Sequence, residues 1–372
     1  MSKHLLCFFV LCLLGSCANN QNSQNDQQGK DNSQLVAMVL VDNQYGFINT
    51  NGEFIIKPQY PLARTFSDGV ACVNIGGQRN NGLVQGVLGG KYYFIDIHNK
   101  KQFDGFFSNS PMSFYNKVAI VEENDNTKTL INREGKKVAT GFSVLGDCQD
   151  NLLPAVIEKE KKLGFINADG SWAIELAYKY FVTPFSEQLS SFTDTDTKLS
   201  GYFNIKGEIA IPATYQFAGN FSEGFAKVKK ELTYSFINRE GKQVIADEFE
   251  NAGDFKNGLC AVQKGGQWGF IDKSGKLVIE YKDLKGVREY SDGRIAFKSK
   301  NGKVGYLDGK GNIVIKPQFD NGLNFKNGYA IIESNGKIGF IDTTGKIIIE
   351  PKYTRAGNFV DPNESNKIMK VN

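Results

Sequence analysis

Few residues in this sequence could take part in catalysis or metal binding. The chain of 372 residues has two histidines, His4 and His98, and six cysteines. A Ser-His-Asp or Cys-His site needs a histidine beside its nucleophile, and no Gly-x-Ser-x-Gly turn presents a serine. Zinc sites need clustered cysteine and histidine, which are scattered here. We therefore expect no catalytic residue, no metal site and no cofactor. The many carboxylates leave a glycosidase-like acid pair as an alternative.

The cysteines and the second histidine have simple structural interpretations. His98 lies inside an Asp-x-x-Asn turn, where we expect a solvated loop side chain. Cys72 and Cys260 lie in short apolar runs (VACV and LCAV), which is typical of small buried hydrophobic residues. With Cys17 acylated, as argued below, Cys148 makes the remaining number odd for a disulfide framework.

The N-terminal segment has the features of an export signal. Lys3 supplies a positive charge, and Leu5 to Leu14 is an apolar run too short to span a bilayer. The run ends in Leu-Gly-Ser-Cys17, which resembles the lipobox of bacterial lipoproteins, in which the cysteine carries the lipid. We therefore predict a signal peptide at residues 1–16 and lipid attachment at Cys17. An ordinary secretory signal is the alternative.

Residues 17–34 are predicted to form a flexible tether. Ten of the 17 residues from Ala18 to Gln34 are Asn or Gln, so the segment has little apolar surface to bury. As a coil it spans roughly 20–25 Å, and fully extended about 55–60 Å. Either length carries a folded domain beyond the lipid headgroups. These features predict a bacterial envelope lipoprotein of the outer membrane, and the sequence does not indicate whether the domain faces the periplasm or the cell surface.

The remaining residues, 35–372, are built from a repeat that is clearest in Gly258 to Ile279 (GLCAVQKGGQWGFIDKSGKLVI). Three β-prone runs, Leu259 to Gln263, Trp268 to Ile271 and Leu277 to Ile279, are separated by two turn signals. Gly265-Gly266 suits a tight hairpin with positive φ, and Asp-Lys-Ser-Gly suits a turn in which the aspartate bonds the backbone two residues on. One unit is therefore expected to be a three-stranded antiparallel meander.

Nine such units follow one another along the chain. Gly269 marks the second run, and its position is filled elsewhere by Gly46, Tyr93, Thr129, Gly164, Gly201, Ser235, Gly305 and Gly339. The turn after that run opens with Asn49, Asp96, Asn132, Asn167, Asn204, Asn238, Asp272, Asp308 and Asp342. A glycine follows three residues later in every unit except the second, where Asn99 replaces it. Asparagine is the next-best residue for a left-handed position, so the recurrent polar residues are explained by turn geometry.

The segments between units carry a second pattern and one insertion. Four third runs end in a proline, at Pro58, Pro212, Pro317 and Pro351, and an aromatic-x-x-Gly step follows, as in Phe255 to Gly258. We interpret these aromatics as staples that pack one unit on the next. The insertion, Arg79 to Gly90, is glycine-rich but lacks the strand-loop-helix context of a phosphate loop. It is predicted to be a long exposed hairpin loop.

The combined pattern resembles the WG-repeat family (KWG repeats) of bacterial envelope and secreted proteins. Trp268-Gly269-Phe270-Ile271-Asp272, Gly275 and the Phe255-x-x-Gly258 step carry the resemblance, which covers nearly the whole mature chain. The tryptophan occurs at this position in one unit only, which weakens the idea of a tryptophan ladder as the working surface. The resemblance implies a tandem β-repeat and no set of catalytic residues.

We therefore predict an all-β repeat domain that closes into a β-propeller-like ring, with an open β-solenoid as the alternative. Val36 to Val41 and Ile368 to Val371 are both strand-like, as overlapping ends of a ring would be. The predicted function is a membrane-anchored, non-enzymatic scaffold that binds a protein or a glycan, with the Arg79 to Gly90 insertion in the contact surface. A hydrolytic propeller is the alternative. The formal net charge is +4 without a basic patch, so nucleic acid is not expected as a partner.

Overall fold

The computed structural model describes residues 35–80, 86–280, 284 and 286–365. The signal peptide, the tether with Cys17, and the expected strand Ile368 to Val371 all lie outside these residues. The described part is all-β, with one short 3-10 helix, η2 (Glu158–Glu160). None of its helical residues forms a segment with the length and apolarity that crossing a bilayer requires.

The described strands form nine small antiparallel sheets, one for each predicted unit, plus a two-stranded ribbon. Sheets 1 to 3 contain, in chain order, β1 (Val36–Val41), β2 (Gln44–Asn49) and β3 (Phe54–Tyr60); β4 (Ala71–Ile75) and β7 (Lys91–Ile95); and β8 (Val118–Glu122), β9 (Lys128–Asn132) and β10 (Lys137–Phe142). The ribbon pairs β5 (Gln78–Asn80) with β6 (Gly86–Leu88). The predicted meander is therefore present in sheets 1 and 3.

Sheets 4 to 9 each have four strands, because a short strand precedes the meander. Sheets 4, 5 and 6 contain β11 (Val144–Leu145), β12 (Leu152–Ile157), β13 (Lys162–Asn167), β14 (Trp172–Leu176); β15 (Tyr180–Val182), β16 (Leu189–Asp194), β17 (Ser200–Asn204), β18 (Ile209–Tyr215); and β19 (Phe217–Ala218), β20 (Ala226–Lys230), β21 (Thr233–Ile237), β22 (Gln243–Phe249). Sheets 7, 8 and 9 contain β23 (Asn251–Ala252), β24 (Leu259–Lys264), β25 (Gln267–Asp272), β26 (Leu277–Ile279); β27 (Gly286–Ser291), β28 (Arg294–Lys298), β29 (Val304–Leu307), β30 (Ile313–Phe319); and β31 (Asn321–Gly322), β32 (Tyr329–Ser334), β33 (Lys337–Asp342), β34 (Ile347–Tyr353). Most of these first strands have two or three residues, too few to show alternation in the sequence.

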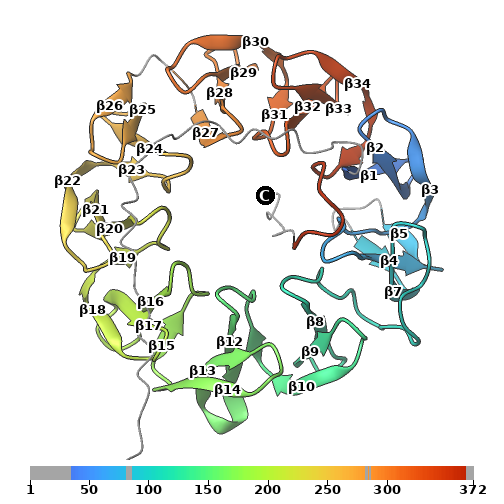
Figure 1. The fold of residues 1–372 in the computed structure, drawn as a ribbon, viewed down its shortest axis with the longest axis horizontal. Coiled ribbons are helices and arrows are strands. Elements are labelled where there is room, and N and C mark those ends of the chain that lie inside the picture. The colour runs from blue at the N-terminus through green and yellow to red at the C-terminus, as the bar shows by residue number, and fades with distance from the viewer. Residues whose placement is uncertain (1–34, 81–85, 281–283, 285, 366–372) are drawn as a thin grey trace, which may run out of the picture. The chain divides into compact units, whose positions relative to one another are not determined.

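The two ends of the repeat domain meet in sheet 1. The last strand, β35 (Arg355–Ala356), pairs with β1, and Val36 and Val360 form a further bridge. A cluster of buried residues joins the two ends, including Ala37 and Val39 from β1 and Phe340 and Phe359 from the C-terminal part. The sheets of this domain thus follow one another around a closed circuit (Figure 1). The predicted β-propeller-like ring is confirmed and is closed by β35, whereas the expected strand Ile368 to Val371 lies outside the described residues.

The turns that recur between the second and third strands of the predicted unit have the expected geometry. In all nine, the fourth residue donates its N–H to the carbonyl oxygen of the first at 2.9 to 3.1 Å. In the seventh unit, Asp272 Oδ1 also accepts from the N–H groups of Ser274 and Lys276. The fourth residue has positive φ even where it is not glycine, since Asn99 adopts 64°. The recurrent Asp/Asn is therefore a turn former.

The glycine of the second run has a separate cause. Beside Gly46, the outer strand β3 carries two extra residues around Pro58, and its backbone approaches closely. A Cβ on Gly46 would lie 2.6 Å from Ile56 O and 2.8 Å from Pro58 N. The same crowding occurs at Gly201, Gly305 and Gly339. The glycine and the proline thus belong to one structural feature, a bulge with two extra residues that bends the outer strand.

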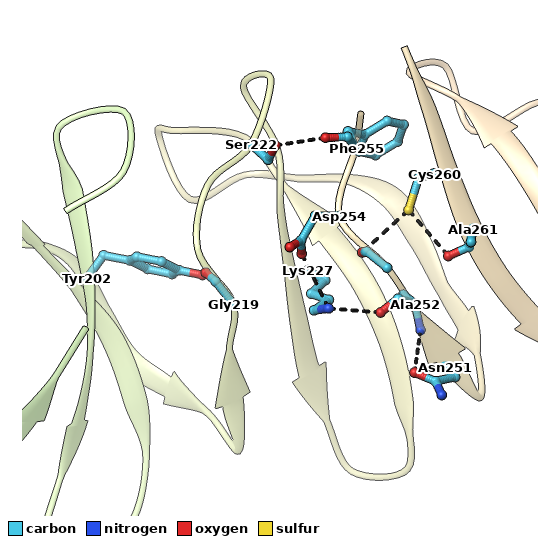
Figure 2. A network of polar contacts seen from close by, with 11 residues as sticks. Tyr202, Gly219, Ser222, Lys227, Asn251, Ala252, Asp254, Phe255, Cys260 and Ala261 are labelled. Carbon is cyan, nitrogen blue, oxygen red and sulfur yellow. Dashed lines mark hydrogen bonds and ion pairs between the residues drawn. The ribbon is translucent and has the colours of Figure 1, made fainter. Parts of the chain in front are cut away.

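Each sheet is joined to the next by a buried cluster and by a few polar contacts. The predicted aromatic staples lie in these clusters: Phe66 contacts Phe47 of sheet 1 at 4.7 Å between ring centroids, and Phe255 contacts Phe236 of sheet 6 at 5.2 Å. Figure 2 shows the polar contacts of sheets 5 to 7. Lys227 Nζ, for example, donates to Ala252 O at 3.0 Å and lies 3.3 Å from Asp254.

A chain of hydrogen bonds also runs between eight tight turns, which we call the inner turns. Each is a four-residue turn that leads into β4, β8, β12, β16, β20, β24, β28 or β32, and its two central residues have positive φ, as in Glu223-Gly224. The first central side chain reaches the next sheet in every case. Asp68, Asp150, Glu187, Glu223 and Asp292 accept from a backbone N–H of the next inner turn. Asn116, Asn257 and Asn327 donate instead to a backbone carbonyl of the next sheet.

The chain of inner turns is completed by the C-terminal segment. Gly69 N–H donates to Pro362 O at 2.7 Å, and Asp68 N–H donates to Glu364 O at 3.0 Å. The Ser365 hydroxyl bonds the Asp68 carboxylate and accepts from the N–H of Asn116. The hydrogen-bond chain therefore returns to the turn at which it began.

Candidate functional site

The residues singled out for chemistry are held apart by the fold. His98 is exposed in its turn, where its N–H donates to Asp96 Oδ1 at 2.9 Å. Cys72, Cys148 and Cys260 are free thiols in separate clusters, and burial raises the pKa of Cys148 to about 11 and that of Cys72 to about 12. Within the described ranges, histidine, cysteine and carboxylate side chains nowhere gather in a group of three able to hold a metal ion. Cys17 lies outside these ranges.

The connections at one edge of the sheets differ between units. We call them the variable edge: the links that join β4 to β7, β8 to β9, β12 to β13 and β16 to β17. Equivalent links in sheets 1, 6, 7 and 9 have two residues, as in Asp42-Asn43 and Gly265-Gly266, whereas the link in sheet 8, residues 299–303, has five. On the variable edge they are the β5–β6 ribbon, residues 123–127, η2 with Lys161, and residues 195–199. Because every sheet has the same strand order, these links lie at the same edge of the circuit.

The insertion between β4 and β7 forms the expected hairpin, and its base is attached to the domain. Arg79 Nη1 donates to Pro61 O at 3.3 Å, and the guanidinium lies over the Tyr45 ring at 5.2 Å. The buried Asn74 side chain bonds the N–H of Gly77 and the carbonyl of Gly89. Arg79 therefore holds the base of the hairpin to sheet 1, and Asn74 holds it to β4. Residues 81–85 at the tip lie outside the described ranges.

A groove of about 990 Å³ lies beside the links of sheets 3 and 4. One wall is the turn from Glu123 to Thr127, and the other is Ile157 with η2. Thr129, Lys137, Thr140, Gly141 and Ser143 line the rest, so most of the lining residues are polar.

A local departure from the repeat produces this groove. Thr129 occupies the glycine position of the second run, and β10 has no proline. The outer strand has its bulge at Gly141, which has a φ of 83°, and its pairing skips from Ala139 to Phe142. A side chain at position 129 needs space that the usual close approach of the outer strand would fill.

Neighbouring groups stabilise the ionised carboxylates on the Glu123 to Thr127 wall of the groove. Glu123 is paired with Lys137 at 2.8 Å; Lys137 and then the nearby Thr129 hydroxyl lower the pKa of Glu123. Asp125 accepts from the hydroxyl and the N–H of Thr127, and these bonds lower its pKa. Such carboxylates stay ionised and cannot act as proton donors near neutral pH. The arrangement suits polar recognition of a ligand.

Comparison with known proteins identifies the family. The model described as WG containing repeat matches residues 45–78, 164–192, 201–231, 234–268, 268–303, 305–337 and 338–362. The matches cover more than half of the chain, which therefore belongs to the WG-repeat family. The segments left between them include residues 79–163 and 193–200, which contain the links of the variable edge. No protein with a curated description matches the sequence.

Solved structures resemble this chain at low sequence identity. A eukaryotic initiation factor superposes with a TM-score of 0.60 at 10% identity, over 89% of this chain and 99% of that one. The computationally designed protein Ika8 gives a TM-score of 0.44 at 12% identity, over 76% and 93%. BamB from Moraxella catarrhalis gives 0.40 at 9% identity, over 71% and 94%. Of these three, the initiation factor alone exceeds a TM-score of 0.5, and at 10% identity the likeness concerns the fold only.

Proposed function

We propose that this WG-repeat protein is a non-enzymatic envelope lipoprotein, anchored through Cys17, that binds a protein or glycan partner along the variable edge. One observation carries the proposal: the elaborated links of four consecutive sheets share one edge, and they fall in the stretches that the family repeat does not account for. Loops released from packing more often carry recognition than loops fixed by it. The polar groove between sheets 3 and 4 lies on the same edge and is the central candidate contact.

The anchor is tested by the mass of the mature protein. Wild type should begin at Cys17 and carry the mass of a lipid, and Cys17→Ala should lack it. A wild-type N-terminus that is not acylated would remove the anchoring part of the proposal and leave the binding part standing.

The binding part is tested with three variants of the same chain. The first replaces residues 80–86 with Asn-Gly, which keeps the Arg79 contacts. The second, Thr140→Arg, fills the groove, and the third, Lys206→Glu, changes an exposed turn away from it. Binding to isolated cell-wall glycan and to a cross-linked envelope partner should weaken in the first two and persist in the third. Equal binding by all three would place recognition elsewhere, and saturable turnover of a bound glycan would refute the non-enzymatic assignment.

A further inference from the structure

A second surface, on the outside of sheet 2, combines positive charge with an exposed aromatic ring. We call it the sheet 2 patch: Lys91, Tyr93, Lys101 and Phe106. Lys101 Nζ lies 4.0 Å from the centroid of the Phe106 ring, and Lys91 Nζ lies 5.3 Å from it. Tyr93 packs edge-on against the same ring at 5.8 Å. Phe106 itself is 51% exposed, so two ammonium groups converge on a ring that faces solvent.

The patch exists because sheet 2 has no regular outer strand. Residues 101–107 take that place through two isolated bridges, Ile95 to Lys101 and Tyr92 to Phe107. Phe103 and Phe107 turn inward and pack against Phe94, with distances of 5.5 and 6.0 Å between ring centroids. Gly105, with a φ of 94°, breaks the alternation between them, and Phe106 is left on the outside. Phe103 and Phe107 pack against the buried cluster that contains Phe94, and Phe106 does not belong to that cluster.

The charges of the patch lack a counterpart within the described part of the chain. No carboxylate there forms an ion pair with Lys91 or Lys101. The nearby Asp96 is occupied by the N–H groups of His98 and Lys100, which leaves Asp104 as the other acid of this segment. Two unpaired ammonium groups over one ring suit an anionic surface that presents several charges rather than a single carboxylate.

We propose that the sheet 2 patch rests on the headgroups of an anionic phospholipid surface. Lysines attract such a surface, and a phenyl ring enters the boundary between headgroups and acyl chains. The proposal rests on the proposed anchoring at Cys17, because the anchor would hold the domain close to a lipid surface. The described chain begins at Leu35 in sheet 1, and Tyr60 of that sheet donates to Asn99 of sheet 2 at 2.6 Å. The segment from Cys17 to Gln34, at most about 60 Å long, therefore keeps the patch within reach of the lipid.

The test uses the full mature chain with Cys17→Ser, so that no lipid anchor holds it to vesicles. Co-sedimentation compares vesicles of phosphatidylethanolamine with phosphatidylglycerol against vesicles of phosphatidylcholine alone. The unlipidated chain should bind the anionic vesicles only, and molar salt should release it. Lys91→Glu with Lys101→Glu should lower the partition coefficient at least about tenfold, because each lysine near an anionic surface contributes about fivefold. The control, Lys206→Glu with Lys310→Glu, has the same net charge and two exposed turn lysines altered.

A second variant separates lipid insertion from simple charge attraction. Phe106→Trp should bind normally and shift its fluorescence to the blue with anionic vesicles, after subtraction of the parent signal, and Phe106→Ala should bind more weakly. The proposal fails if the unlipidated chain does not bind anionic vesicles, if phosphatidylcholine binds equally, or if the control loses as much as the patch variant. It also fails if millimolar inorganic phosphate displaces the vesicles at constant ionic strength, which would indicate a site for a free anion. Because no variant here carries the lipid, each result is independent of the acylation test above.

Discussion

At the scale of single residues, the repeat is a set of backbone requirements. The Asp/Asn that recurs in every unit uses its side chain to stabilise its own turn, as Asp272 does by accepting hydrogen bonds from the N–H groups of Ser274 and Lys276. The glycine before it marks a close approach between strands, where a Cβ on Gly339 would lie 2.6 Å from Ile349 O. These positions are therefore weak candidates for binding or catalysis, however regularly they recur.

Gly339→Ala should destabilise the domain by about 1–3 kcal/mol, because the added methyl group must displace the backbone of β34. Gly86→Ala is the matched control, since a Cβ there meets no atom within 4 Å. Thermal unfolding of the two variants beside wild type measures the difference. Equal melting temperatures would show that β34 moves freely, contrary to the close approach described.

The buried cysteines should be inert in the folded protein. Burial raises the pKa of Cys148 to about 11, so its thiolate is scarce at pH 8. In the Cys17→Ser variant we expect no reaction of Cys72, Cys148 and Cys260 with a thiol reagent until denaturant is added, and then reaction of all three. Rapid labelling of native protein would mean that a cluster opens locally.

At the scale of elements, the inner turns join neighbouring sheets by a simple rule. The first central residue is acidic where it accepts from the next turn, and asparagine where it donates to a carbonyl of the next sheet. Glu223 shows the strongest version: it accepts from the N–H groups of Asn257 and Gly258 and pairs with Lys273 at 3.1 Å. Partial burial raises the pKa of Glu223, but Gly258, Lys273 and Asn257 together outweigh this and lower it.

Glu223→Gln should therefore cost stability at neutral pH, by about 1–2 kcal/mol for the weakened charged hydrogen bonds. A lowered pKa in the folded state gives stability that is present above the pKa of the unfolded chain and is lost as pH falls through the folded value. The gap in melting temperature between wild type and Glu223→Gln should accordingly narrow as pH falls from 7 to about 3. Glu240→Gln, in an exposed turn, should leave the melting temperature unchanged at every pH.

The sequence predicted the units, their turns and the aromatic staples because local physics determines each of them. The positive φ of Asn99 was predictable, because asparagine is the residue that most readily replaces glycine in a left-handed turn position. The short first strands were not predicted from the sequence, because a two-residue strand such as Asn251–Ala252 is defined only by its pairing with the neighbouring strand, β24. The hydrogen bonds between inner turns were not predicted for the same reason. A side chain able to form hydrogen bonds before the turn glycine, as at Asp68 and Glu223, would have been a usable signal for them. The groove depends on spacing between sheets, and its one sequence trace is Thr129 in a glycine position.

At the scale of the whole repeat domain, β35 pairs with the inner edge of β1 and so joins the two ends of the array into a closed circuit. Removing residues 354–372 deletes β35, the buried Phe359 and the contacts of Pro362 and Glu364 with the first inner turn. We expect this variant to form oligomers by joining the exposed sheet of one chain to another, or to aggregate. Removal of residues 366–372 alone keeps all of these contacts and should leave a monomer. Light scattering after size exclusion measures both, and a monomeric, stable 354–372 deletion would show that β35 is dispensable.

Closure through sheet 1 also sets an order in time. The first three strands of that sheet lie near the start of the repeat domain, and the strand that completes it is supplied by residues 355–356, close to the end. A chain that is synthesised from its N-terminus must therefore reach residues 355–356 before this first sheet is complete. Until then the inner edge of β1 is a vacant strand position that any extended segment could occupy. Pairing of residues 355–356 with β1 therefore ends the period in which this strand edge is open to other segments.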